Sequence, residues 1–237
     1  MDQKPKEGEM ERYIIDDTLI NDHVEGLKLG FIVAAKNASE KELKEMILYV
    51  DTKDNLFGEI EKLLGTFAVK KLRKEGYFYI DEADCGIRLL TRKTFSLTTI
   101  NNSVLAAFTS EESLSVLDDK RQYISSVVVV PWTISDVSFW KYTWDYKSIS
   151  VDGTEQLVSN SINANQVLID TICTITKIVN VGDNLSNKSD AGFAKRKLQE
   201  LKERSIPFDC KQVKALALRN GWKTAGAVKL MSICEKC

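Results

Sequence analysis

The spacing of the apolar residues changes twice along this chain, and this change constrains the fold more than any other feature. Before residue 76, apolar residues recur every three or four positions, as Val24, Leu27 and Phe31 do, which is typical of amphipathic helices. From residue 77 to about residue 160 the period is close to two, which is typical of half-buried strands. Helical spacing then returns. We therefore expect an α+β fold with N-terminal helices, central antiparallel strands and a helical C-terminal region.

Four helices are predicted before the first strand. Ser39 and Glu42 form a capping-box pattern that opens the second helix, and Gly65 and Gly76 end the third and fourth as C-terminal glycines. The four helices are predicted over residues 17–35, 39–50, 56–64 and 67–75. Later helices are predicted over residues 162–179, 193–204, 210–219 and 224–234.

The central section is predicted to be mostly strand. Its densest aromatic segment, residues 139–146, alternates aromatic and polar residues and is expected to be a strand with its rings on one face. Such a face is usually core or a protein interface, and it can also stack nucleic-acid bases. The rings are those of Trp140, Tyr142, Trp144 and Tyr146.

These patterns divide the chain into five segments. A disordered polar tail is expected first and a linker rich in Asn, Ser, Gly and Asp near residue 185. The segments are a tail (1–12), a helical, winged-helix-like region (13–100), a mostly β section ending in a helix (101–180), the linker (181–192) and a basic helical region (193–237).

Composition excludes several classes of protein. With 43% hydrophobic and 28% charged residues and only 3 prolines, the chain is neither collagen-like nor disordered. No apolar run is long enough for a membrane-spanning helix, and residues 1–13 are too polar for a secretory signal. An odd number of cysteines, five, without such a signal favours free thiols. We therefore expect an intracellular protein, in the cytoplasm, nucleoid or nucleus, with no membrane partner.

Positive and negative charges are distributed unevenly along the chain, although the net charge is only −1. Residues 188–237 contain 12 Lys and Arg against 5 Asp and Glu, a balance of +7, which leaves −8 for the rest of the chain. A compact positive segment attracts phosphate backbones by counterion release, so we expect DNA or RNA as a partner. An acidic protein surface, including the N-terminal region of the same protein, is the alternative. The predicted phosphate contacts are Lys195, Arg196, Lys197, Lys202, Arg204, Lys211, Lys214, Arg219 and Lys223.

Residues 56–97 predict a second basic patch. The segment is predicted to contain two short helices followed by a two-stranded ribbon. This is the order of elements in a winged-helix domain, whose second helix enters the major groove of DNA. The basic residues of this helix are Lys70, Lys71, Arg73 and Lys74. The acidic ribbon tip, residues 81–84, would repel phosphate, and a module of this kind also serves in protein interactions.

We expect no catalytic residue, cofactor or metal site. His23, the single histidine, falls in a helical pattern and is predicted to be a helix-surface residue. Residues 81–84 spell the Asp-Glu-Ala-Asp motif of helicase-type ATPases, but the chain has no phosphate loop ending in Gly-Lys-Ser/Thr. A metal-dependent nuclease using these acids is the remaining enzyme alternative. Cys234 and Cys237 supply only two of the four ligands of a structural zinc and are predicted to be free thiols.

The sequence thus predicts a non-enzymatic nucleic-acid-binding or transcription-associated regulatory protein. The alternative is a structural or regulatory protein that self-associates or binds another protein through the aromatic segment and its oppositely charged ends. No residue pattern distinguishes DNA from RNA or indicates sequence specificity.

Overall fold

The computed structural model describes residues 10–19, 21–81, 84–97, 99–160 and 162–237. It divides into two compact units. The sheet unit comprises Met1–Trp140 and Asp145–Ser159, and the helical unit comprises Lys141–Trp144 and Asn160–Cys237.

One sheet of eight strands organises the described part of the sheet unit. Its order is β3-β4-β2-β5-β6-β1-β7-β8, and all neighbours from β4 to β7 run parallel. Only the two edge pairs, β3 with β4 and β7 with β8, are antiparallel. The strands are β1 (Glu11–Ile15), β2 (Glu45–Val50), β3 (Tyr77–Ile80), β4 (Cys85–Thr91), β5 (Asn102–Ala107), β6 (Ile124–Val130), β7 (Tyr146–Ile149) and β8 (Glu155–Val158).

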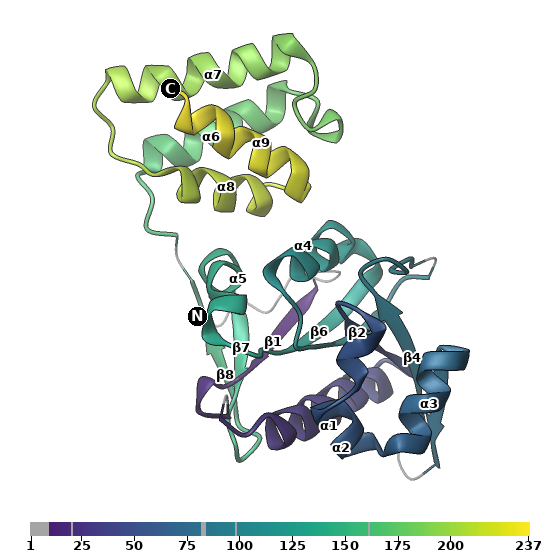
Figure 1. The fold of residues 1–237 in the computed structure, drawn as a ribbon. Helices are drawn as coiled ribbons and strands as arrows, with labels where there is room; N and C mark the ends of the chain where they lie inside the picture. Colours follow the sequence, from purple (N-terminus) through teal and green to yellow (C-terminus); the bar gives the residue numbers. More distant parts are fainter. Residues whose placement is uncertain (1–9, 20, 82–83, 98, 161) are drawn as a thin grey trace. The chain divides into compact units, whose positions relative to one another are not determined.

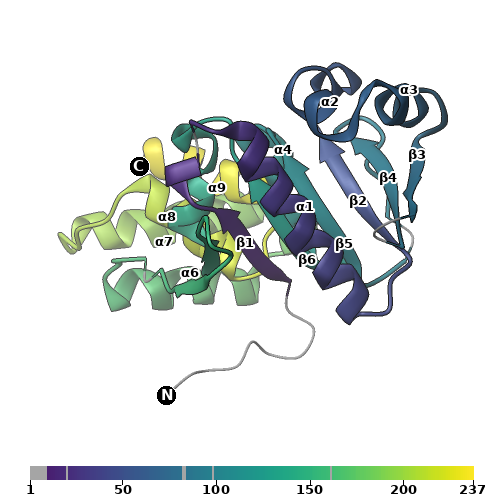
Figure 2. The same cartoon turned by 90° about the horizontal axis from the view of Figure 1, so that it is seen from below.

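Helices cover both faces of this sheet. Figure 1 shows α4 (Glu111–Asp119) on one face, and Figure 2 shows α1 (His23–Glu40) along the other, over β5 and β6. The helices α2 (Glu59–Leu64) and α3 (Thr66–Glu75) pack on the same face as α1. Because both faces are covered, the central strands are continuous apolar runs, which is typical of parallel sheets.

The predicted helix over residues 39–50 is wrong. Residues 45–50 form β2, which lies between β4 and β5, and its last five residues are all buried. A run of apolar residues buried on both faces satisfies a helical spacing and a strand equally, so periodicity does not distinguish the two. The predicted tail is also too long, because residues 11 and 12 belong to β1 and Arg12 is buried. Residues 1–9 lie outside the described residues.

The helix-helix-ribbon order predicted for residues 56–97 is confirmed by α2, α3, β3 and β4. The structure does not confirm a separate winged-helix unit, because β4 pairs along its length with β2 and is part of the large sheet. The ribbon is therefore a sheet edge. The 13–100 and 101–180 segments share this sheet, since β2 also pairs with β5.

The central section differs from the prediction in two ways. Its strands β5 and β6 are parallel and joined by α4, and among its described residues β7 and β8 form the antiparallel pair. The aromatic segment begins as α5 (Ser138–Thr143), so its rings do not share one face of a strand. Trp140 and Trp144 are four residues apart, which also fits a helical turn, and both are buried.

The helical unit is built from four helices, as far as it is described. They are α6 (Gln166–Ile178), α7 (Lys188–Glu203), α8 (Cys210–Arg219) and α9 (Thr224–Glu235). Their apolar sides meet in a core that includes Leu168, Leu198, Val213 and the fully buried Trp222. The predicted linker at 181–192 instead contains a 3-10 turn and the start of α7, and α6 packs against α7 and α8. The helical unit thus begins before the predicted linker. No helix in the described parts of the chain is long and apolar enough to cross a membrane.

Candidate functional site

The basic residues of α7 lie opposite its apolar side. Ala194, Leu198 and Leu201 are buried, and their spacings of four and three place them on the inner side of the helix. Lys195 and Lys202 are exposed and seven residues apart, so they lie on one outer face of α7. The amphipathic pattern of α7 therefore positions its cations toward solvent.

Most of the predicted phosphate contacts in the helical unit are exposed. Lys197 and Lys214 are half-buried. The exposed ones are Lys195, Arg196, Lys202, Arg204, Lys211, Arg219 and Lys223.

Several of these cations already have partners. Lys197 forms an ion pair with Glu200 at 2.7 Å, and the Nζ of Lys211 lies 4.5 Å from the ring centroid of Tyr142. Arg219 donates from Nε to the carbonyl of Thr143 at 2.5 Å. These residues stabilise the fold of the helical unit in addition to any role in binding.

Four of the predicted residues remain available for a ligand. Lys195, Arg196, Arg204 and Lys223 are exposed, and no described acidic side chain lies within ion-pair distance of them. Lys223 also precedes α9 without capping it, and the first turn of α9 contains no acidic residue. A cation at this position adds to the positive end of the helix dipole, which favours anions.

The second predicted patch, on α3, belongs to the sheet unit. Lys70, Lys71 and Lys74 are exposed. Arg73 is half-buried, forms an ion pair with Asp54 at 3.1 Å and lies over the ring of Phe57. Arg73 therefore attaches α3 to the loop after β2, and the two predicted patches lie on different units.

Both enzyme alternatives use the acidic residues 81–84, of which Asp81 and Asp84 are described and lie between β3 and β4 in the sheet unit. Glu82 and the alanine after it lie outside the described residues, and Tyr79 donates a hydrogen bond to Asp84 across the β3–β4 turn. Where the structure describes the chain, no three His, Cys, Asp or Glu side chains gather as they would around a metal ion.

The prediction of free thiols at Cys234 is wrong. Cys234 forms a disulfide with Cys210, joining the start of α8 to the end of α9. Cys237 remains free, as do Cys85 and Cys173. The short spacing of Cys234 and Cys237 gives no indication that Cys234 pairs with Cys210, 24 residues earlier. The antiparallel packing of α8 on α9 brings Cys210 and Cys234 together.

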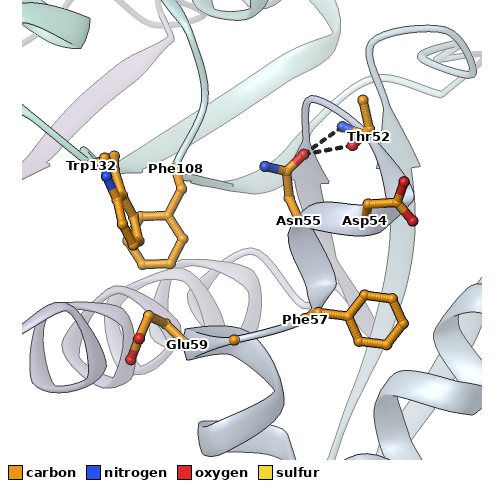
Figure 3. Close-up of a pocket in the computed structure, with 8 residues that line it drawn as sticks. Thr52, Asp54, Asn55, Phe57, Glu59, Phe108 and Trp132 are labelled. Carbon is orange, nitrogen blue, oxygen red and sulfur yellow. Dashed lines mark hydrogen bonds between the residues drawn. The ribbon is translucent and has the colours of Figure 1, made fainter.

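A cavity at the carboxyl edge of the sheet was missed by the sequence analysis. It has a volume of about 470 Å³ and lies among the segments that follow β2, β5 and β6 (Figure 3). Its lining residues are Thr52, Asp54, Asn55, Phe57, Gly58, Glu59, Phe108 and Trp132. They are scattered over 81 positions, and the order of the parallel strands brings them together. The available signal was the polar segment 51–55 directly after the apolar run of β2, since β5 and β6 are followed by Phe108 and Pro131.

The comparisons with known proteins concern the helical unit alone. Residues 164–237 match the family model of a domain of unknown function (DUF1889). This region contains α6 to α9 and is less than half of the chain. No curated protein and no solved structure matches the chain.

Proposed function

We propose that this protein binds nucleic acid without catalysis, through the exposed cations of its helical unit. The observation that carries the proposal is the set of four predicted cations, Lys195, Arg196, Arg204 and Lys223, which are exposed and have no described acidic partner. Holding like charges on one small unit is unfavourable unless an anion neutralises them. A polyphosphate backbone supplies regularly spaced anions and releases counterions on binding.

The helix pair α8–α9 supports this proposal. The sequence predicted a helix, a glycine-containing turn and a second helix here, and the structure has α8 and α9 joined through Gly221. In helix-turn-helix proteins the second helix approaches DNA with its N-terminal residues. In this protein the second helix is α9, and Lys223 lies at its N-terminus without a side-chain capping hydrogen bond. Because DNA and RNA are intracellular polyanions, the proposal places the protein inside the cell, as a regulatory or transcription-associated factor.

A salt titration of the full chain tests the proposal. Fluorescence anisotropy is measured with labelled single-stranded DNA, double-stranded DNA and RNA at increasing salt. The logarithm of the binding constant should fall linearly with the logarithm of the salt concentration. For a duplex, the slope should be about −0.9 for each phosphate that the protein neutralises. The triple variant Lys195→Gln, Arg196→Gln, Lys223→Gln should bind more weakly and lower this slope by up to about 3.

A matched control separates this site from general charge effects. Lys44, Lys93 and Lys120 are exposed lysines of the sheet unit, and changing all three to Gln removes the same charge. This variant should bind nucleic acid almost as the natural chain does. Equal losses in both triple variants, or no binding to any probe at low salt, would contradict the proposal. A salt-dissociated dimer that binds no nucleic acid, seen by light scattering, would favour the assembly alternative instead.

A further inference from the structure

The cavity in the sheet unit lies where two chain connections leave the sheet in opposite directions. After β2 the chain continues to α2 and α3 on one face, and after β5 it continues to α4 on the other face (Figure 1). Neighbouring parallel strands that diverge in this way leave a crevice at their carboxyl ends, and ligands of α/β sheets bind there. Asp51 accepts hydrogen bonds from the backbone N–H of Ser110 at 3.2–3.3 Å and braces the two connections.

One wall of the cavity is aromatic. The rings of Phe108 and Trp132 have centroids 5.1 Å apart at an interplanar angle of 87°, and Figure 3 shows both on the same side of the cavity. His23, from the start of α1, stacks on Trp132 with centroids 4.1 Å apart. Trp132 is nevertheless 48% exposed. A large aromatic surface is thus held rigid but not covered, which is typical of a ligand contact.

The backbone of Phe108 supports a role for this wall. Its φ is +55°, in the left-handed region that bulky residues rarely adopt, and its N–H donates to the carbonyl of Val130 at 2.8 Å. Strained backbone of this kind clusters at functional sites, where the surrounding structure holds a side chain in place.

The opposite wall offers a hydrogen-bond donor. Asn55 uses its Oδ1 to accept from the backbone N–H and the hydroxyl of Thr52, at 2.8 and 2.9 Å. These bonds fix the orientation of the amide, so its Nδ2 group points across the cavity toward Phe108 (Figure 3). An oriented amide donor facing an aromatic wall suits a planar heterocycle with an acceptor atom on its edge.

The charge of the lining limits the ligand further. Asp54 and Glu59 are acidic, and no lysine or arginine is among the described residues that line the cavity. Glu59, whose side chain is 19% exposed, uses one oxygen to pair with Lys62 at 2.7 Å. Asp54 likewise pairs with Arg73 at 3.1 Å. Because no cation lines the cavity, the lining offers a phosphate no partner, whereas a carboxylate of the lining can accept a hydrogen bond from an amino group.

We propose that this cavity binds a free, unphosphorylated nucleoside or nucleobase. The base packs against Phe108 and Trp132, an acceptor atom on its edge receives the Nδ2 hydrogen of Asn55, and Glu59 accepts from its amino group or from ribose hydroxyls. This site is independent of the cationic surface of the helical unit. The bases of a polynucleotide fit it less well, because each is flanked by phosphates for which the lining offers no cation.

Calorimetric titration of the full chain with the four ribonucleosides, their 5′-monophosphates and ribose tests this proposal. At least one nucleoside should bind, its monophosphate at least about tenfold more weakly and ribose not measurably. Asn55→Asp keeps the oxygen that Thr52 needs and removes the donor, so it should weaken binding about tenfold or more. Phe108→Gly removes the ring where glycine suits the backbone, and it should abolish binding.

Two controls keep the result interpretable. Phe67→Ala removes an aromatic ring that is 69% exposed on α3 of the same unit, and it should leave nucleoside affinity unchanged. The triple Gln variant of the helical unit should also bind nucleosides normally, so this inference and the proposed function fail separately. Absence of nucleoside binding by the folded natural chain, or equal affinity of nucleoside and monophosphate, would overturn the inference.

Discussion

At Gly30, α1 packs closely against the sheet. A Cβ atom at this position would lie 2.6 Å from Cγ2 of Val130 and 3.0 Å from Cδ1 of Leu105. Gly26, one turn earlier on the same helix, has its nearest such neighbour at 3.5 Å, from Ile15. The sequence does not distinguish these two glycines, because both occur in the same amphipathic pattern. Only the contact with β5 and β6 makes one of them necessary.

Substituting each glycine by alanine should therefore change the free energy of unfolding in opposite directions. Gly30→Ala forces α1 away from the sheet and should lower the free energy of unfolding by about 1–3 kcal/mol. Gly26→Ala fits without strain and should raise it by up to about 1 kcal/mol, since alanine favours helix. Urea unfolding followed by circular dichroism measures both. A Gly30→Ala variant as stable as the natural chain would show that α1 does not pack as closely as described.

At the scale of elements, a buried ion pair connects β1, α4 and α5. Asp118 on α4 accepts from Nη2 of Arg12 on β1 at 3.3 Å and from Nε1 of Trp140 on α5 at 3.0 Å. The side chains of Arg12 and Asp118 are only 4% and 5% exposed. A buried charge that loses its partner is strongly destabilising, because the remaining charge is neither hydrated nor paired.

Asp118→Asn should accordingly lower the free energy of unfolding by about 3–5 kcal/mol. The same helix offers a control, since Glu112 forms an exposed ion pair with Arg92. Glu112→Gln should cost at most about 1 kcal/mol, because solvent screens an exposed pair. Thermal unfolding of the two variants makes the comparison, and similar losses in both would contradict the burial of the Arg12–Asp118 pair.

At the scale of the whole molecule, each unit has its own core, and the disulfide lies entirely within the helical unit. The Cys210–Cys234 bond closes a loop with a sequence separation of 24 and ties α8 to α9. A cross-link over a loop of this length stabilises a fold by about 2–4 kcal/mol, chiefly by restricting the unfolded chain. In a reducing compartment this contribution would be absent.

Reduction should therefore lower the stability of one unit only. Denaturant unfolding with and without dithiothreitol should show the transition of the helical unit at lower denaturant after reduction, with the transition of the sheet unit unchanged. Cys210→Ser should reproduce the effect and make the chain insensitive to the reductant. The oxidised chain should contain three titratable thiols, Cys85, Cys173 and Cys237. Five thiols in the oxidised chain would rule out the bond.

The sequence by itself determined the α+β class, the position of α3 and the C-terminal helices, and the separation of charge along the chain. These depend on spacing and composition within short windows, as in α3, where Gly65 and Gly76 mark both ends. Residues 45–50 were assigned wrongly because a segment buried on both faces contains no local signal for strand or helix.

Only the tertiary structure decided the parallel order of the strands, the pairing of Cys210 with Cys234 and the partners of Arg73 and Arg219. It also decided that His23, Asn55, Phe108 and Trp132 lie around one cavity. Each of these results depends on contacts between residues far apart in the chain. Such contacts form because packing both faces of a sheet selects one strand order, and no local pattern specifies that order.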